Sequence, residues 1–201
     1  MARFVVGDPP NSGTLAILPS AFNPVTTAHL GLAQAAIEQA RVDHVAFVLP
    51  ENLPHKQFYG ASFDQRLEMV MSVAEVQSVV VASGGLVYEI VQELSESTAA
   101  EIAVLCGRDA AERFISWDYG EGPSIERQLK EYRLIVADRD GRYRPPAHLD
   151  ARVEPVQLQE SVESVSSTSL RQAILGQEPW EHITPEPVAQ LIRRFELYCC
   201  C

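Results

Sequence analysis

The chain has 201 residues, 46% of them hydrophobic, and its 16 Lys and Arg against 27 Asp and Glu give a formal net charge of −11. This length suits one domain with a substantial core, and the negative field disfavours nucleic acid and anionic membranes as partners, so any phosphate site has to be local. No apolar run approaches the ~20 residues that span a bilayer, and residues 1–13 lack a secretory-signal pattern. We therefore expect a cytoplasmic protein.

Short apolar runs alternate with helical patterns along the chain, which predicts parallel βαβ units. The class expected is α/β, with a Rossmann-like, doubly wound parallel sheet flanked by helices. Strands are predicted at residues 15–18, 45–49, 79–81, 102–105 and 134–136, with a short one near 151–156. Helices are predicted at residues 28–40, 63–73, 169–175 and 185–195, with a weaker pattern at 88–94, and loops at 120–123 and 139–148.

The four cysteines provide no disulfide framework. Cys106 stands alone in an apolar run, and Cys199, Cys200 and Cys201 are consecutive at the end of the chain, where adjacent side chains fit a tetrahedral zinc site poorly. We interpret residues 199–201 as a flexible tail. Residues 1–13 are interpreted as an N-terminal extension of a single domain that spans residues 1–201.

A first phosphate-binding motif follows the first predicted strand, in the sequence Pro-Ser-Ala-Phe-Asn-Pro-Val-Thr-Thr-Ala-His at residues 19–29. Ser20 and Ala21 are small enough for backbone N–H groups to approach a phosphate, and the helix that follows adds its positive amino-terminal dipole. Thr26 and His29 are three residues apart and can face the same way. A lone histidine is more often an ordinary helix residue, but these neighbours favour donation from His29 to phosphate oxygens.

A second phosphate-binding motif lies far along the chain, at residues 165–171, Val-Ser-Ser-Thr-Ser-Leu-Arg. Ser166, Ser167 and Thr168 offer hydroxyls and amides at a helix start, and Arg171 stands on the first turn. These residues could also be a helix cap followed by a solvated arginine, and the residues alone leave both interpretations open.

Together the two motifs resemble those of the adenylyl and cytidylyl transferases, Gly-x-Phe-x-Pro-x-(His/Thr)-x-x-His and Ile-Ser-Ser-Thr-x-Ile-Arg, in the same order. The resemblance extends over about residues 15–198. It implies catalytic roles for Thr26, His29 and Arg171, and ATP binding by Ser20, Ala21, Phe22, Ser166, Ser167 and Thr168. Ser20 replaces the family's usual glycine, and serine would be strained there if the backbone needs a positive φ.

Three further segments are similar to the bacterial nicotinate mononucleotide adenylyltransferases. Residues 53–56, Leu-Pro-His-Lys, look like a family motif in which Lys56 helps to hold phosphate. Gly107 and Asp109 resemble the family's Gly-x-Asp, where the glycine permits close approach and the carboxylate accepts hydrogen bonds from a ribose. Trp117 matches the tryptophan that stacks on the pyridine ring.

The resemblance is weaker where the acceptor is chosen. The family's Ser-Tyr-Thr-x-x-Thr segment is here Val-Tyr-Glu-Ile-Val-Gln, so Tyr88 is retained but a glutamate follows it. That glutamate would disfavour a nicotinate carboxylate, which leaves the choice between acid and amide open. Asn23 and Arg139 are the other predicted acceptor contacts, together with Tyr88 and Trp117.

The resemblance implies transfer of AMP from ATP to nicotinate or nicotinamide mononucleotide in NAD biosynthesis, with release of pyrophosphate. Mg²⁺ would be bound with ATP and would use phosphate oxygens and water, so we expect no metal-ligand cluster in the protein. One alternative is another phosphate acceptor, such as phosphopantetheine, or CTP as donor. A second is a nucleotide-binding protein without turnover. Assembly as a homo-oligomer is left open.

Overall fold

The computed structural model describes residues 1–52, 60–75, 77–138 and 141–199, and seven strands of this part form one sheet. Their order across the sheet is β1-β4-β3-β2-β5-β6-β7, and every neighbouring pair is parallel except β1 with β4. The strands are β1 (Arg3–Val6), β2 (Thr14–Pro19), β3 (His44–Pro50), β4 (Ser78–Ala82), β5 (Glu101–Gly107), β6 (Arg133–Ala137) and β7 (Val153–Val156). The predicted doubly wound α/β fold is confirmed.

The central strands are apolar throughout because both faces of the sheet are covered. In β2, Leu15 and Ile17 belong to the core on one face, whereas Ala16 and Leu18 belong to the core on the other. Successive side chains of a strand point to opposite faces, so a strand buried on both sides needs an uninterrupted apolar run. This explains why the short apolar runs were good predictors of the strands.

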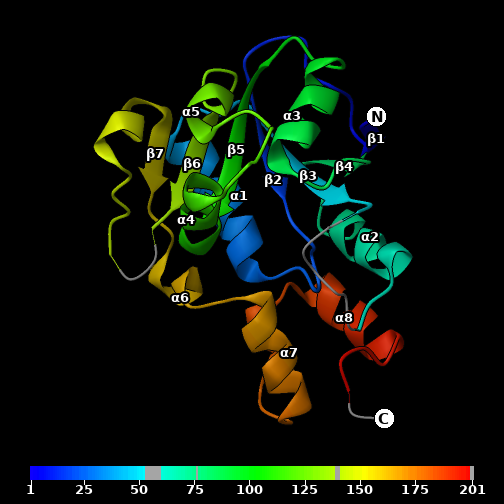
Figure 1. Cartoon of the computed structure of the whole chain (residues 1–201). Coiled ribbons are helices and arrows are strands. Elements are labelled where there is room, and N and C mark those ends of the chain that lie inside the picture. The colour runs from blue at the N-terminus through cyan, green and yellow to red at the C-terminus, as the bar shows by residue number, and fades with distance from the viewer. Residues whose placement is uncertain (53–59, 76, 139–140, 200–201) are drawn as a thin grey trace.

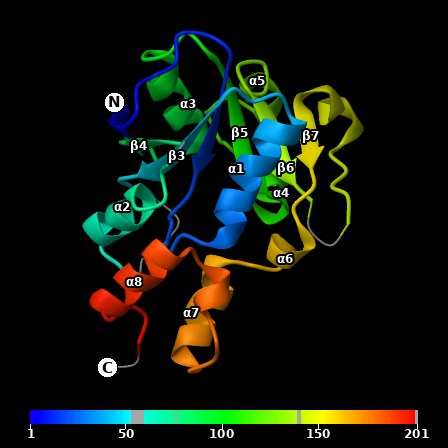
Figure 2. The same ribbon diagram turned by 180° about the vertical axis from the view of Figure 1, so that it is seen from behind.

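Helices cover both faces of the sheet. On one face lie α1 (Thr27–Gln39) and α2 (Phe63–Met71), and on the other lie α3 (Val87–Ser95), α4 (Arg108–Ser116) and α5 (Ile125–Gln128) (Figures 1 and 2). Three more helices, α6 (Glu160–Glu163), α7 (Ser167–Leu175) and α8 (Glu186–Arg194), lie beyond the carboxyl ends of the strands, and two 3₁₀ helices span Ala147–Arg152 and Glu181–Ile183. Within the described ranges, no helix is long and apolar enough to cross a membrane.

The strand order creates a crevice between β2 and β5. From β2 the chain moves outward through β3 to β4, then returns to β5 beside β2 and continues the other way through β6 to β7. The connections that leave β2 and β5 therefore run to opposite faces of the sheet. The carboxyl edge at such a switch of direction is the usual ligand site of an open α/β sheet.

Some elements differ from those predicted. Residues 3–6, inside the segment interpreted as an N-terminal extension, form the edge strand β1, and the helices α4, α5 and α6 were not predicted. The turn at residues 120–123 is present, and Gly122 N donates to Tyr119 O at 2.9 Å. Of the predicted loop at 139–148, residues 141–146 carry no helix or strand and a 3₁₀ helix begins at Ala147.

Candidate active site

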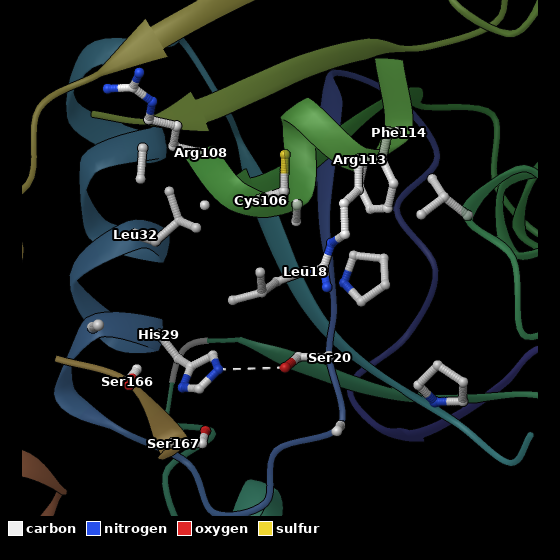
Figure 3. A pocket seen from close by; sticks show the side chains of 18 of the residues that line it. Leu18, Ser20, His29, Leu32, Cys106, Arg108, Arg113, Phe114, Ser166 and Ser167 are labelled. Atoms are coloured by element: carbon white, nitrogen blue, oxygen red, sulfur yellow. Dashed lines mark hydrogen bonds between the residues drawn. The ribbon is translucent and has the colours of Figure 1, made fainter. Parts of the chain in front are cut away.

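A cavity of about 400 Å³ opens at the carboxyl edge of the sheet, at the switch between β2 and β5 (Figure 3). Two of its walls carry different sets of side chains. The histidine wall comprises Ser20, Ala21, Thr26, His29, Ser166 and Ser167, from the loop after β2 and the starts of α1 and α7. The aromatic wall comprises Tyr88, Arg113, Phe114, Trp117 and Tyr119, from α3 and from α4 and the turn after it.

His29 is held by the cap of the helix that carries it. Thr26 is the N-cap of α1 and is fully buried, and its backbone N–H donates to Nδ1 of His29 at 3.0 Å. Because a backbone N–H can only donate, Nδ1 of His29 must accept. The Thr26 hydroxyl, 2.9 Å away, can donate to the same nitrogen. The proton of the neutral ring is therefore on Nε2. That nitrogen lies 3.4 Å from the Ser20 hydroxyl at the cavity (Figure 3), so the ring presents a fixed N–H donor there.

Phe22 supports His29 from behind and does not line the cavity. Its ring is fully buried, with its centroid 5.0 Å from that of His29 and 5.5 Å from that of Phe47. Phe22 also adopts the left-handed backbone conformation of this turn, with φ of 45°, whereas Ser20 does not have a positive φ. Serine therefore replaces the family's glycine without backbone strain, and the ATP contact predicted for Phe22 stays a prediction.

The loop between β2 and α1 is fixed by side chains from distant parts of the chain. Four of its backbone carbonyls accept such bonds: Ala21 from Arg66 at 2.9 Å, Asn23 from Arg171 at 2.5 Å, Pro24 from Ser167 at 2.7 Å and Val25 from Thr184 at 2.7 Å. The side-chain oxygen of Asn23 also accepts from the hydroxyl of Tyr198 at 2.6 Å, and both residues are buried. Much of the order of this loop therefore comes from α2, α7 and the end of the chain.

The start of α7 faces the same cavity as the start of α1. Ser166 caps α7 by accepting from Ser169 N at 3.0 Å, and Ser166 and Ser167 line the cavity. Thr168 and Arg171 do not line it, because the Arg171 guanidinium turns to the Asn23 carbonyl and lies 3.3 Å from the Thr168 hydroxyl. Two helix amino termini with their positive dipole ends thus meet at one cavity, which favours an anion in this acidic protein.

The end of β5 leaves space for a ligand. Gly107 lines the cavity, and a Cβ added to it would meet no atom within 4 Å. Cys106 also lines the cavity but is buried, which raises the pKa of its thiol to about 12, so it is a neutral wall group and not a nucleophile at neutral pH. Asp109 is exposed and lies outside the lining, so the ribose contact predicted for it stays a prediction.

The aromatic wall is more open than the histidine wall. Trp117 is 44% exposed and lines the cavity, so it is not a residue of the core. Tyr88 lines the cavity and its hydroxyl donates to Glu131 at 3.3 Å. Glu89 lies outside the lining, because its carboxylate accepts from Gly85 N at 2.9 Å and from Leu86 N at 3.0 Å at the start of α3.

Asn23 is a predicted contact that is not brought to the cavity, because it does not line it and is bound to Tyr198. Lys56 and Arg139 lie outside the described residues, so the contacts predicted for them stay predictions. Conversely, Arg113 lines the cavity but was not predicted. The signal that could have identified it is its position four residues before Trp117, because residues so spaced share one face of a helix.

Comparison with known proteins agrees with this architecture. The family model described as cytidylyltransferase-like matches residues 17–173, which is most of the chain. The chain belongs to this family. The resemblance to the nucleotidyl transferases is thereby confirmed, and the matched region includes both phosphate-binding motifs.

Relatives of this chain cover nearly its whole length. A "probable nicotinate-nucleotide adenylyltransferase" of Exiguobacterium sibiricum is 29% identical over 195 residues, covering 92% of this chain and 98% of the relative. A relative from Rhodopirellula baltica with the same description is 28% identical over 213 residues, covering 94% of this chain and 95% of the relative. The solved nicotinic acid mononucleotide adenylyltransferase of Plasmodium falciparum complexed with NaAD has a TM-score of 0.70 at 14% identity, covering 92% of this chain and 97% of the other. That last likeness supports the fold.

Proposed function

We propose that the protein transfers the AMP moiety of ATP to nicotinate or nicotinamide mononucleotide, forming the dinucleotide and pyrophosphate for NAD biosynthesis. The observation that carries the proposal is the Nε2–H donor of His29, fixed at the cavity where the starts of α1 and α7 meet. Donors of this kind stabilise the charge that develops on phosphate oxygens during phosphoryl and nucleotidyl transfer.

The reaction needs no covalent enzyme intermediate. An oxygen of the acceptor's phosphate attacks the α-phosphorus of ATP, the new P–O bond forms, and the bond to the bridging oxygen of the departing pyrophosphate breaks. The attacking phosphate is already ionised at neutral pH, so no general base is required. His29 would donate to the oxygens that gain charge, while the hydroxyls and amides of Ser20, Ser166 and Ser167 would hold the phosphates in line.

Mg²⁺ would enter with ATP. This ion retains several waters and is often held by substrate phosphates rather than by a protein cage. Within the described part of the chain, no group of three or more His, Cys, Asp or Glu side chains could hold a metal. Because Mg²⁺ favours phosphate oxygens and water as ligands, we propose that it binds the triphosphate, while side chains and helix termini of the protein position the reactants.

The choice of acceptor is supported by the aromatic wall and by the relatives. Trp117 and Phe114 line the same cavity as the histidine wall and offer aromatic surface on which an electron-poor pyridinium ring can stack. The relatives from Exiguobacterium sibiricum and Rhodopirellula baltica, both described as probable nicotinate-nucleotide adenylyltransferases, match 92% and 94% of the chain. A pyridine mononucleotide is therefore the acceptor class we propose, with ATP as donor.

Pyrophosphate release is the direct test. The purified protein is incubated with Mg²⁺ and either ATP or CTP, together with nicotinate mononucleotide, nicotinamide mononucleotide or phosphopantetheine, and the nucleotide product is identified by mass. We expect turnover with ATP and a pyridine mononucleotide, and its loss in His29→Ala. Turnover only with phosphopantetheine or with CTP would replace the proposed reaction by a related one. Binding of ATP without pyrophosphate release from any pair would indicate a non-catalytic binding protein.

A further inference from the structure

Arg113 is a cation on the aromatic wall without a partner in the described part of the chain. It lies on α4, one turn before Trp117 and next to Phe114, and its side chain is exposed and lines the cavity. Figure 3 shows its guanidinium reaching from α4 into the cavity. No hydrogen bond or ion pair joins it to any described residue. An arginine directed into a ligand cavity in this way can bind an anionic group of the ligand.

The other ionisable groups nearby are engaged. Arg108, on the first turn of the same helix, also lines the cavity, but its guanidinium pairs with Glu112 at 2.9 Å. Asp138 lines the cavity but accepts from Tyr143 N at 2.7 Å. Positive charge on this side of the cavity is therefore available chiefly from Arg113.

The backbone amides opposite α4 are also engaged. The start of α3 would ordinarily offer N–H groups to an anion. Here Glu89 accepts from Gly85 N and Leu86 N, while Glu93 accepts from Gly84 N at 2.6 Å and from Ser83 N at 3.1 Å. The protein's own carboxylates thus occupy the amide donors of residues 83–86. A ligand carboxylate beside the aromatic rings needs another donor.

Two anionic groups of the acceptor could reach Arg113, namely its phosphate and a carboxylate on its ring. The phosphate donors belong to the histidine wall, in the loop after β2 and at the starts of α1 and α7, whereas Arg113 lies on α4 beside Phe114, and Trp117 directly follows that helix. On the basis of the proposed function, we propose that Arg113 binds the carboxylate of a pyridine carboxylate ring and so selects the acid over the amide acceptor.

The chemistry of the two acceptors explains the selection. A guanidinium can donate two parallel hydrogen bonds to a carboxylate, and the ion pair adds to their strength. A carboxamide is neutral and presents an N–H₂ donor that the guanidinium cannot accept from. Arg113 therefore favours the acid by attraction and disfavours the amide by an unmatched donor.

The test compares both acceptors in Arg113→Gln, Arg113→Lys and the wild type. We expect the wild type to prefer nicotinate mononucleotide. In Arg113→Gln the kcat/KM for nicotinate mononucleotide should fall about tenfold to a hundredfold, because a charged hydrogen bond is lost. The kcat/KM for nicotinamide mononucleotide should fall by less than about threefold. Arg113→Lys should restore part of the preference. Arg127→Ala, an exposed arginine on α5 that does not line the cavity, is the matched control and should leave both values unchanged.

Calorimetric binding of the same two mononucleotides separates this inference from the proposed function. The wild type could release no pyrophosphate but bind nicotinate mononucleotide more tightly than nicotinamide mononucleotide, with this difference in affinity lost in Arg113→Gln. In that case the proposed reaction is wrong and the role of Arg113 is upheld. Equal losses for both acceptors would instead indicate phosphate binding by Arg113 and overturn the inference. An unchanged preference in Arg113→Gln, or a wild type that binds neither compound, would overturn it as well.

Discussion

The two walls of the cavity are held in different ways. In the histidine wall, Thr26 is fully buried, and the loop between β2 and α1 is bound by side chains from α2, α7 and the end of the chain. In the aromatic wall, Trp117 is 44% exposed and Arg113 has no described partner. The first arrangement suits chemistry common to many nucleotidyl transfers, since it fixes donors before the substrate arrives. The second leaves the side chains proposed to recognise the acceptor more exposed.

The largest effect is expected in the histidine wall, from His29→Ala. Removal of the Nε2–H donor should lower kcat for pyrophosphate release about a hundredfold to a thousandfold, because a fixed donor to developing negative charge is lost. His182→Ala, an exposed histidine outside the cavity, should retain wild-type kcat. Comparable activity of His29→Ala and His182→Ala would remove His29 from the mechanism.

The distant support of the same wall can be tested through Tyr198. In Tyr198→Phe the buried side-chain oxygen of Asn23 loses its donor at 2.6 Å, and the free energy of unfolding should fall by about 1–3 kcal/mol. Denaturant unfolding measures this difference. Tyr143→Phe is a matched control, since Tyr143 is also buried but its hydroxyl forms no hydrogen bond with a described residue. An equal loss in both variants would show that the Tyr198 hydroxyl does not support the loop.

In the aromatic wall, Trp117→Ala should affect binding but not folding. Loss of stacking should raise the KM for the pyridine mononucleotide about tenfold, with the KM for ATP and the melting temperature nearly unchanged, because the side chain is 44% exposed. Trp180→Ala is the control, since Trp180 packs on Arg193 outside the cavity. A large loss of stability in Trp117→Ala would show that the Trp117 side chain supports the fold rather than ligand binding.

The same contrast explains what the sequence could predict. The strands buried on both faces were predicted because each is a short apolar run, and the histidine wall because Thr26 and His29 lie in one local helix cap. Phe22 and Asn23 show the limit of a motif. Both belong to it, yet Phe22 packs beneath His29 and Asn23 binds Tyr198, so a sequence pattern does not separate ligand contacts from the residues that hold the loop.

The aromatic wall was harder to predict because it depends on helix register and on distant packing. α4 begins directly after β5, with Gly107 as its N-cap, so no loop marks its start in the sequence. Arg113 becomes a candidate only once α4 is known to place it on the face of Trp117. Likewise, the acid next to Tyr88 suggested repulsion of a carboxylate, whereas Glu89 instead caps the start of α3.

The smallest expected effect concerns Glu93, which accepts hydrogen bonds from Ser83 and Gly84. These two residues precede α3, the helix that carries Tyr88 of the aromatic wall. Burial alone would raise its pKa, but these hydrogen bonds and the amino group of Met1 hold the pKa of the carboxyl below its usual value. A lowered folded-state pKa stabilises the protein above the unfolded pKa, and the stabilisation is lost as the pH falls through the folded pKa. Glu93→Gln should therefore reduce the free energy of unfolding by about 1 kcal/mol at pH 7, and by progressively less in acid. The exposed Glu96→Gln should show no such trend, and a pH-independent difference for Glu93→Gln would mean that its charge does not hold this wall.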